Sequence, residues 1–255
     1  MGKIIAIANQ KGGVGKTTTS ISLSAALALE GKKILVVDAD PQGNCTSGFG
    51  VDKNIQTNTL YELLLDECST KECILRNVIE GVDLIPSNIN LAAAEIELIG
   101  IHRKEFILRD ALDYIRDDYD YIIMDCPPSL NLLTVNAMTA ADSVIVPIQC
   151  EYYALEGLSQ LIHTINLVRE RLNRRLDVEG IVFTMYDART NLSAQVVENV
   201  RENVQQFIYN TVIPRNIRLA EAPSYGEPIT VYDPRSAGAA AYRALAVEVI
   251  QKDEG

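Results

Sequence analysis

The sequence predicts an α/β fold in which a single doubly wound, mostly parallel sheet is flanked by helices. Short runs rich in β-branched residues alternate with stretches of helical periodicity along the chain. Several of these runs are apolar without alternation, which is typical of strands buried on both faces. A glycine-rich loop separates the first run from the first helical stretch, as in phosphate-binding folds. Because the 255 residues contain no linker and no low-complexity segment, we expect one domain over 1–255.

The individual elements can be placed in order along the chain. The expected strands are 3–9, 33–38, 82–87, 119–125, 142–148, 180–186 and 211–214. Helical periodicity predicts a helix over 17–30, ended by Gly31 as a C-cap, and a second helix over 154–172. Ser193 is expected to be the N-cap of a further helix that extends to about Tyr209.

Composition and charge limit the classes of protein to be considered. A net charge of −11 argues against a surface that is basic throughout. However, 10 of the 11 basic residues in 151–255 are Arg, so a local basic face remains open. No apolar run approaches the roughly 18 residues of a membrane span, and no signal peptide is recognisable. Five cysteines without a Cys-x-x-Cys pair indicate reduced thiols. We therefore expect a cytoplasmic protein without a membrane partner.

The glycine-rich loop is the strongest candidate site. It consists of Lys11, Gly12, Gly13, Val14, Gly15, Lys16, Thr17 and Thr18. Its glycines let backbone N–H groups face a polyphosphate, and the N-terminus of the following helix adds its positive dipole end. Lys16 would neutralise phosphate charge, and the hydroxyl of Thr17 would bind Mg²⁺. The usual loop begins with glycine where this chain has Gln10, and Lys11 is a charge that a simple phosphate loop does not need.

Two further sites place carboxylates at the ends of expected strands. Asp38 ends one strand, and Asp40 follows it in a Pro/Gly loop. Asp125 ends another strand and precedes Cys126 and a Pro-Pro turn. Carboxylates at strand ends beside a phosphate loop can hold Mg²⁺-bound water or orient an attacking water. We expect Asp40 and Asp125 to reach Mg²⁺ through water, whereas Cys126 is expected to be a packed thiol.

Together the three sites resemble the deviant Walker A ATPases, whose loop follows the pattern K-G-G-x-G-K-[ST]. Three later stretches narrow the resemblance to the ParA/Soj family of chromosome-partitioning ATPases. They are QCEYYALEGLSQL (149–161), DARTN (187–191) and IPRNIRLAEAPSYG (213–226). The resemblance extends from Gly2 to about Val249. It implies a P-loop NTPase fold, ATP and Mg²⁺ as cofactors, and weak basal hydrolysis of ATP to ADP and phosphate.

The resemblance also implies roles for the nucleotide-site residues. Lys11 would reach across an ATP-sandwich homodimer to the phosphates held by the partner subunit. Lys16 and Thr17 would bind phosphate and Mg²⁺ within their own subunit. Asp40 would position the hydrolytic water, and Asp125 would be the Walker B acid. The implied catalytic set is therefore Lys11, Lys16, Asp40 and Asp125.

Further positions are implied for adenine and DNA. Pro214 and Asn216 fall where the family cradles adenine. Arg189 and Arg218 match arginines that bind double-stranded DNA without sequence specificity. An isolated Arg is more often a solvated residue or a salt-bridge partner, so the DNA assignment depends on the resemblance. Three more arginines are weaker candidates for the same face: Arg215, Arg235 and Arg243.

These roles amount to an ATP-dependent switch for chromosome or plasmid partitioning. ATP would close the dimer, the dimer would bind DNA, and hydrolysis would release it. By resemblance, a ParB-type centromere-binding protein would stimulate hydrolysis, and the protein would associate with the nucleoid. The replication initiator is a further candidate partner, because some Soj-type proteins act on it.

Three alternatives share the same loop. A MinD-like division-site ATPase would need a basic amphipathic C-terminal helix, whereas the alanine-rich tail 237–255 reads as a helix packed on the body of the protein. An electron carrier like the nitrogenase iron protein would need a paired cysteine pattern that is absent from this sequence. A nucleotide-dependent scaffold without hydrolysis would not need Asp40 and Asp125.

Overall fold

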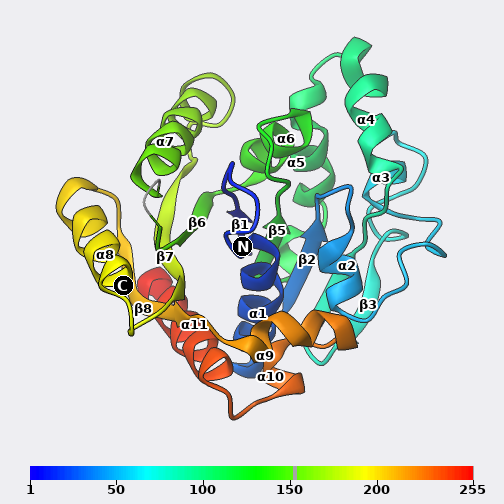
Figure 1. Cartoon of the computed structure of the whole chain (residues 1–255). Helices are drawn as coiled ribbons and strands as arrows, with labels where there is room; N and C mark the ends of the chain where they lie inside the picture. Colours follow the sequence, from blue (N-terminus) through cyan, green and yellow to red (C-terminus); the bar gives the residue numbers. More distant parts are fainter. Residues whose placement is uncertain (152–153, 255) are drawn as a thin grey trace.

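One eight-stranded sheet forms the centre of the molecule (Figure 1). The computed structural model describes residues 1–151 and 154–254. The strand order is β3-β4-β2-β5-β1-β6-β7-β8. β3 is antiparallel to β4, and the other neighbouring strands are parallel. The strands are β1 (Lys3–Ile7), β2 (Ile34–Asp38), β3 (Leu75–Ile79), β4 (Val82–Ile85), β5 (Tyr121–Asp125), β6 (Ser143–Gln149), β7 (Asp177–Tyr186) and β8 (Ile208–Pro214).

Helices cover both faces of this sheet (Figure 1). The first face carries α3 (Leu60–Leu64), α4 (Leu91–Glu97), α5 (Ile107–Asp113), α6 (Leu132–Ala140), α7 (Ala154–Arg171) and α8 (Asn191–Asn203). The second face carries α1 (Lys16–Leu29), α2 (Asn44–Gly48), α9 (Ile217–Glu221), α10 (Ile229–Tyr232) and α11 (Ala237–Glu254). Short 3₁₀ turns are η1 (Leu98–Gly100), η2 (Lys104–Phe106), η3 (Arg116–Asp118) and η4 (Ala222–Tyr225). The predicted doubly wound α/β fold is confirmed.

The central strands have no solvent-facing side, and this explains their apolar sequences. In β1, Ile4 and Ala6 belong to the core under the first face, whereas Ile5 and Ile7 belong to the core under the second. Successive side chains of a strand point to opposite faces, so a strand between two helical layers must be apolar at every position. The uninterrupted apolar runs in the sequence follow directly from this arrangement.

Three features of the local structure differ from the sequence-based expectations. β3, which lies at the edge of the sheet, was not among the expected strands. Thr190, and not Ser193, is the N-cap of α8, because the extended Thr190 accepts a hydrogen bond from the backbone N–H of Ser193. The helix also ends at Asn203, since Val204 is extended and Tyr209 is fully buried in β8.

The C-terminal tail packs on the body of the protein, as the sequence predicts. α11 contacts α1 and β8, and Leu245, Ala246 and Val249 are fully buried. Among the described helices, none is long and apolar enough to cross a membrane. All five cysteines are free thiols, and Cys126 is buried, as expected for a packed thiol.

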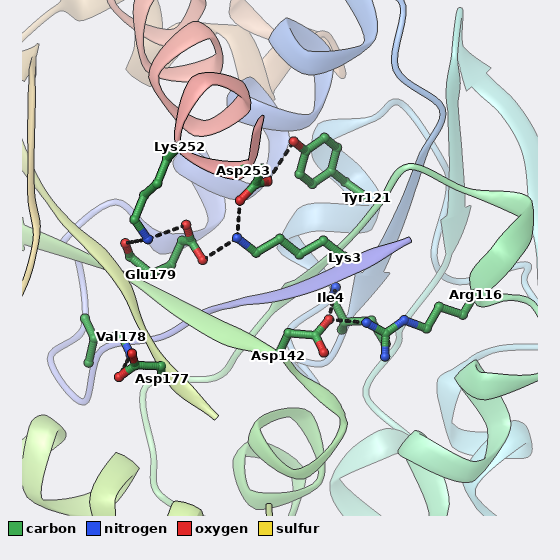
Figure 2. Close-up of polar contacts among 10 residues, drawn as sticks. All are labelled: Lys3, Ile4, Arg116, Tyr121, Asp142, Asp177, Val178, Glu179, Lys252 and Asp253. Atoms are coloured by element: carbon green, nitrogen blue, oxygen red, sulfur yellow. Dashed lines mark hydrogen bonds and ion pairs between the residues drawn. The ribbon is translucent and has the colours of Figure 1, made fainter. Parts of the chain in front are cut away.

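An ionic cluster attaches the end of α11 to the sheet (Figure 2). Glu179 of β7 is 2% exposed and contacts Lys252 at 2.8 Å and Lys3 at 2.7 Å. Asp253 pairs with Lys3 and accepts a hydrogen bond from Tyr121 at 2.8 Å. Burial alone would raise the pKa of Glu179, but the hydrogen bonds from Lys252 and Lys3 outweigh it and lower the pKa. The cluster therefore joins the end of α11 to β7 and β1 through an ionised Glu179.

Candidate nucleotide-binding site

Strand register brings the three sequence motifs together at one edge of the sheet. β5 lies between β1 and β2, and all three strands are parallel. Asp125 is paired in register with Ile7 on one side and with Asp38 on the other. The glycine loop leaves β1 at this edge, and Asp40 leaves β2 there. Motifs that are more than 80 residues apart in the sequence thus meet at the carboxyl ends of adjacent strands, where α/β sheets bind ligands.

The glycine loop has the conformation that its residues predict. Gly13 and Gly15 have φ of 76° and 88°, which L side chains rarely adopt. Gly15 is the N-cap of α1, which begins at Lys16 and runs for 14 residues. A Cβ atom added at Gly12 or Gly13 would meet no atom within 4 Å, so the space beside these two residues is open. The loop can therefore accept an anion against backbone N–H groups at a helix N-terminus.

Two neighbouring strands hold this loop in place. The side chain of Asn9 donates to the carbonyl of Pro147 at 2.7 Å and accepts from the backbone N–H of Lys11 at 3.0 Å. Thr184 of β7 donates to the carbonyl of Val14 at 2.8 Å. These contacts join the loop to β6 and β7. The sequence analysis did not predict that Asn9 and Thr184 support the loop. The position of Asn9 directly after a buried strand is the one sequence feature that indicates such a role.

Lys16 is a buried lysine whose environment suits the binding of an anion. Its side chain is buried, and its Nζ donates to the carbonyl of Lys11 at 3.3 Å. Burial lowers the pKa of Lys16, although the nearby Asp125 and Asp40 act in the opposite direction. A phosphate oxygen in the loop would give this ammonium group a charged partner.

The buried carboxylates fit a divalent cation. Asp125 is fully buried, and its Oδ1 accepts a hydrogen bond from Ser20 at 2.8 Å. Its Oδ2 is buried without a hydrogen-bond partner among the described residues. Burial raises the pKa of Asp125, and repulsion by Asp38 raises it further. Mg²⁺ or its water ligands would satisfy the Oδ2 atom and offset the negative charge. Thr17 is close enough to stabilise the ionised carboxylate through its hydroxyl.

Asp38 and Asp40 differ in what their carboxylates do. Asp38 accepts hydrogen bonds from the hydroxyl and the backbone N–H of Thr46 at 2.6 and 2.8 Å, and so fixes the start of α2. Asp40 is 9% exposed and accepts from the backbone N–H of Gln42 at 2.9 Å. The hydroxyl of Ser87 holds the carbonyl of Asp40 at 2.8 Å. The carboxylate of Asp38 thus has a structural role in holding α2. The carboxylate of Asp40 is held by a hydrogen bond but remains partly accessible at the carboxyl edge of the sheet.

No dedicated metal cage exists in this part of the chain. Among residues 1–151 and 154–254, no group of three or more His, Cys, Asp or Glu side chains could hold a metal ion. Mg²⁺ commonly binds through one or two protein ligands, substrate phosphates and water. The arrangement of Thr17, Asp40 and Asp125 is compatible with that mode.

A cavity beside the loop contains the residues expected to cradle adenine. Its volume is about 540 Å³, and Gly15 and Thr18 of the loop line it together with Pro214, Asn216 and Tyr242. Pro214 ends β8, and Asn216 caps α9 by accepting from the backbone N–H of Arg218 at 2.8 Å. The fold thus brings the stretch IPRN next to the phosphate loop.

Lys11 is engaged within its own subunit. Its ammonium group forms an ion pair with Glu151, which follows β6. The two side chains are 45% and 30% exposed. Glu151 was not among the expected site residues, and the neighbouring Tyr152 and Tyr153 of the stretch 149–161 lie outside the described residues.

The two predicted DNA-contacting arginines are exposed and paired with carboxylates. Arg189 is 86% exposed and forms two hydrogen bonds with Asp187, at 2.8 and 2.7 Å. These bonds lower the pKa of Asp187 to about 2. Arg218 is 50% exposed and contacts Glu221 at 2.9 Å and Asp233 at 3.5 Å. Arg189 also lines the cavity of Pro214 and Asn216.

The three weaker candidates are placed differently. Arg215 is exposed and lines the same cavity. Arg235 is exposed, whereas Arg243 is half-buried and donates to the carbonyl of Pro234 at 2.9 Å. Arg243 is therefore the least available of the three to an external phosphate.

Comparison with known proteins identifies the family. A family model described as an AAA domain matches residues 2–178. The chain is 57% identical over 249 residues to the sporulation initiation inhibitor protein Soj of Bacillus subtilis, with 98% of both chains covered. It is 51% identical over 253 residues to the chromosome partitioning protein ParA of Caulobacter vibrioides, covering 98% of this chain and 95% of that protein. The chain belongs to the ParA/Soj family of chromosome-partitioning proteins.

Other members and solved structures agree with this assignment. The chromosome-partitioning ATPase Soj of Treponema pallidum is 46% identical over 253 residues, with 99% of both chains covered. A structure named cobyrinic acid a,c-diamide synthase, from Mycobacterium smegmatis with ADP and magnesium, is 38% identical with a TM-score of 0.89 and coverage of 100% and 96%. The cell division ATPase MinD of Pyrococcus furiosus is 28% identical with a TM-score of 0.82 and 99% coverage of both chains. Among the proteins named here, the partitioning proteins have the higher sequence identities to this chain.

Proposed function

We propose that this ParA/Soj protein is a partitioning ATPase that works as a nucleotide-controlled switch. The observation that carries the proposal is the meeting of Lys16, Asp40 and Asp125 around an open glycine loop at one sheet edge. A relative is named as an ATPase, and a similar structure holds ADP with magnesium. The same chemistry is expected for this chain.

The residues would divide the work of hydrolysis. Backbone N–H groups of the loop would hold the phosphates, and Lys16 would neutralise charge on the β- and γ-phosphates. Mg²⁺, when bound, would offset the charge that develops during phosphoryl transfer. Asp40 would orient the attacking water, because the backbone N–H of Gln42 holds its carboxylate and the hydroxyl of Ser87 holds its backbone carbonyl. Asp125 would hold a metal-bound water, since its Oδ2 atom has no other partner among the described residues.

In the proposed dimer, Lys11 would bind the nucleotide of the opposite subunit. Lys11 stands at the exposed start of the loop, while the buried Lys16 would bind the phosphates of its own subunit. In a two-fold dimer with two nucleotides between the subunits, each Lys11 would bind the phosphates on the opposite side. Its ion pair with Glu151 must then open. ATP would promote closure because its additional phosphate would offer Lys11 a charged hydrogen-bond partner in place of Glu151.

DNA binding would follow from dimerisation. A single subunit offers few phosphate contacts, and a dimer doubles them on one face. Each contact releases counterions, so affinity rises steeply with their number. Arg189 and Arg218 are the proposed contacts, and phosphate oxygens would have to replace their present carboxylate partners. A ParB-type partner would then trigger hydrolysis and release, with the nucleoid as the site of action.

One measurement tests nucleotide, dimer and DNA together. The mass of the protein is determined by light scattering with ATP or ADP, with and without nonspecific DNA. We expect a dimer with ATP and Mg²⁺, and a larger complex when DNA is added. A monomer under all conditions would contradict the proposal. Lys11→Ala tests the role in trans, since a variant that still dimerises and hydrolyses ATP normally would refute it.

The MinD-like alternative is less well supported. A membrane-binding tail needs an apolar face that is free, whereas Leu245, Ala246 and Val249 of α11 are fully buried in a helix that contacts α1 and β8. Co-sedimentation with anionic liposomes in the presence of ATP separates the two functions. The switch proposal predicts that the protein stays in the supernatant.

A further inference from the structure

A second large cavity lies away from the nucleotide site, between α3, α4 and α5. Its volume is about 710 Å³, and its lining is mostly apolar, including Leu65, Leu98, Ile101, Ile107, Ala111 and Tyr114. These helices lie on the first face of the sheet, at the end opposite α8 (Figure 1). None of the lining residues belongs to the nucleotide-site motifs. We call this surface the α3–α5 groove.

Exposed apolar side chains gather around this groove. Ile101 is 50% exposed and Tyr114 is 86% exposed, and both line it. Ile96 of α4 and Ile99 of η1, which flank the lining residues Glu97 and Leu98 in the chain, are 72% and 64% exposed. Large apolar side chains on one surface indicate an interaction site when they are contiguous with a cavity. Their exposure to water would be reduced by an occupant.

The charge around the groove specifies what the occupant should be. Asp66, Glu97 and Asp110 line it together with one basic residue, Lys71, and the charge of Asp110 is offset by Arg103 and Arg109. Asp110 contacts arginines, but among the described residues neither Asp66 nor Glu97 has a cationic group within 4 Å. Residues 60–118 contain 13 acidic and 6 basic side chains, and so carry most of the net charge of −11. The groove is therefore lined mostly by apolar residues, carries Asp66 and Glu97 without cationic partners among the described residues, and lies in an acidic segment of the chain.

We propose that the α3–α5 groove docks a basic amphipathic helix of a partner protein. Apolar residues on one face of such a helix would enter the groove at i, i+3, i+4 and i+7 spacing. Lysines or arginines on its flanks would pair with Asp66 and Glu97. A second copy of this chain is a poorer occupant, because its own surface is acidic and would be repelled. DNA is excluded for the same reason.

The proposal can be tested with a designed peptide and the full chain. The probe is a fluorescein-labelled amphipathic helix of about 18 residues, or five turns, with Leu on one face and Lys on the other. Its control has Glu in place of every Lys. Fluorescence anisotropy should show binding of the Lys peptide and at least about tenfold weaker binding of the Glu peptide.

Matched variants locate the binding surface. Ile101→Lys combined with Tyr114→Lys should weaken binding of the Lys peptide by about tenfold or more, because apolar anchors dominate such interfaces. Leu29→Lys combined with Val231→Lys adds the same charge at exposed apolar positions outside the groove, and should change binding by less than about twofold. All four positions are at least half exposed, so the variants should fold.

Three results would overturn the proposal. They are equal binding of the Lys and Glu peptides, equal effects of the two double variants, and a nucleotide-free wild-type dimer that the groove variant dissociates in light scattering. The last result would assign the groove to a second copy of the chain. Because the test needs neither ATP nor DNA, it is independent of the proposed switch.

Discussion

The ion pair between Lys11 and Glu151 leads to a specific prediction about dimerisation. If Lys11 binds the partner subunit's nucleotide, each subunit must give up its own Lys11–Glu151 contact when the dimer closes. Glu151 then favours the monomer. Glu151→Gln removes the negative charge while keeping the size of the side chain, and should therefore strengthen ATP-dependent dimerisation.

The expected size of the effect follows from the exposure of the pair. Lys11 and Glu151 are 45% and 30% exposed, and ion pairs of this kind contribute about 0.2–1 kcal/mol. A two-fold dimer breaks two such pairs, or about 0.4–2 kcal/mol in total. The dissociation constant of the dimer should fall by about 2- to 30-fold. The effect should shrink as salt concentration rises, because exposed charges are screened.

Sedimentation velocity over a protein concentration series, with Mg²⁺ and a nonhydrolysable ATP analogue, measures this constant. Glu156→Gln is the matched control, since it makes the same change at an exposed position in the first turn of α7. The Glu151→Gln effect should vanish in a Lys11→Ala background. A Glu151→Gln variant that dimerises as weakly as the wild type, or more weakly, would refute the reasoning.

Three further predictions concern hydrolysis, DNA binding and stability. Asp40→Ala should slow ATP hydrolysis by about 100-fold or more in a phosphate-release assay while the ATP-bound dimer still forms. Arg218→Ala should make the plot of log affinity for DNA against log salt less steep by about 1.8, since each dimer loses two phosphate contacts; an unchanged slope removes Arg218 from the DNA face. Glu179→Gln should lower the free energy of unfolding in urea by about 2 kcal/mol, because two lysines lose their buried negative partner and only one acceptor oxygen remains. The pKa of Glu179 is lower in the folded state than in the unfolded state, so its ionised form stabilises the fold. The full destabilisation by Glu179→Gln should therefore be measured above about pH 4.3, the ordinary pKa of Glu. It should disappear as the pH falls through the pKa of Glu179 in the folded state. A loss that persists at low pH would contradict the role of its charge.

The nucleotide site was predictable because its parts obey local rules. The open loop needs glycine at positive φ, and Gly13 and Gly15 supply it. Asp38 and Asp125 follow apolar runs that could be recognised as buried strands. Once the strands are parallel, their carboxyl ends must share one edge of the sheet. That the motifs meet at this edge depends in addition on the strand order, which places β5 between β1 and β2.

Contacts between distant segments were not predictable in the same way. Nothing near Glu151 or Thr184 in the sequence indicates that either side chain meets the loop, because both come from the strands β6 and β7 and their connections. The boundary errors have a related cause. Ser193 is an acceptable cap, but the turn formed by Asp187 and Thr190 starts the helix first. Tyr209 fits a helix by composition, yet its ring packs against Gly180 of the adjacent strand.

The position of Arg189 decides how the DNA proposal should be tested. Arg189 lines the cavity that holds Pro214 and Asn216, and its guanidinium is fixed by Asp187. A substitution there changes the wall of the proposed adenine site as well as the proposed DNA face. Loss of DNA binding by Arg189→Glu would then follow from weaker ATP binding alone. Arg218 stands outside that cavity, so a variant at Arg218 that keeps its ATP-dependent dimer isolates the contribution of DNA phosphates.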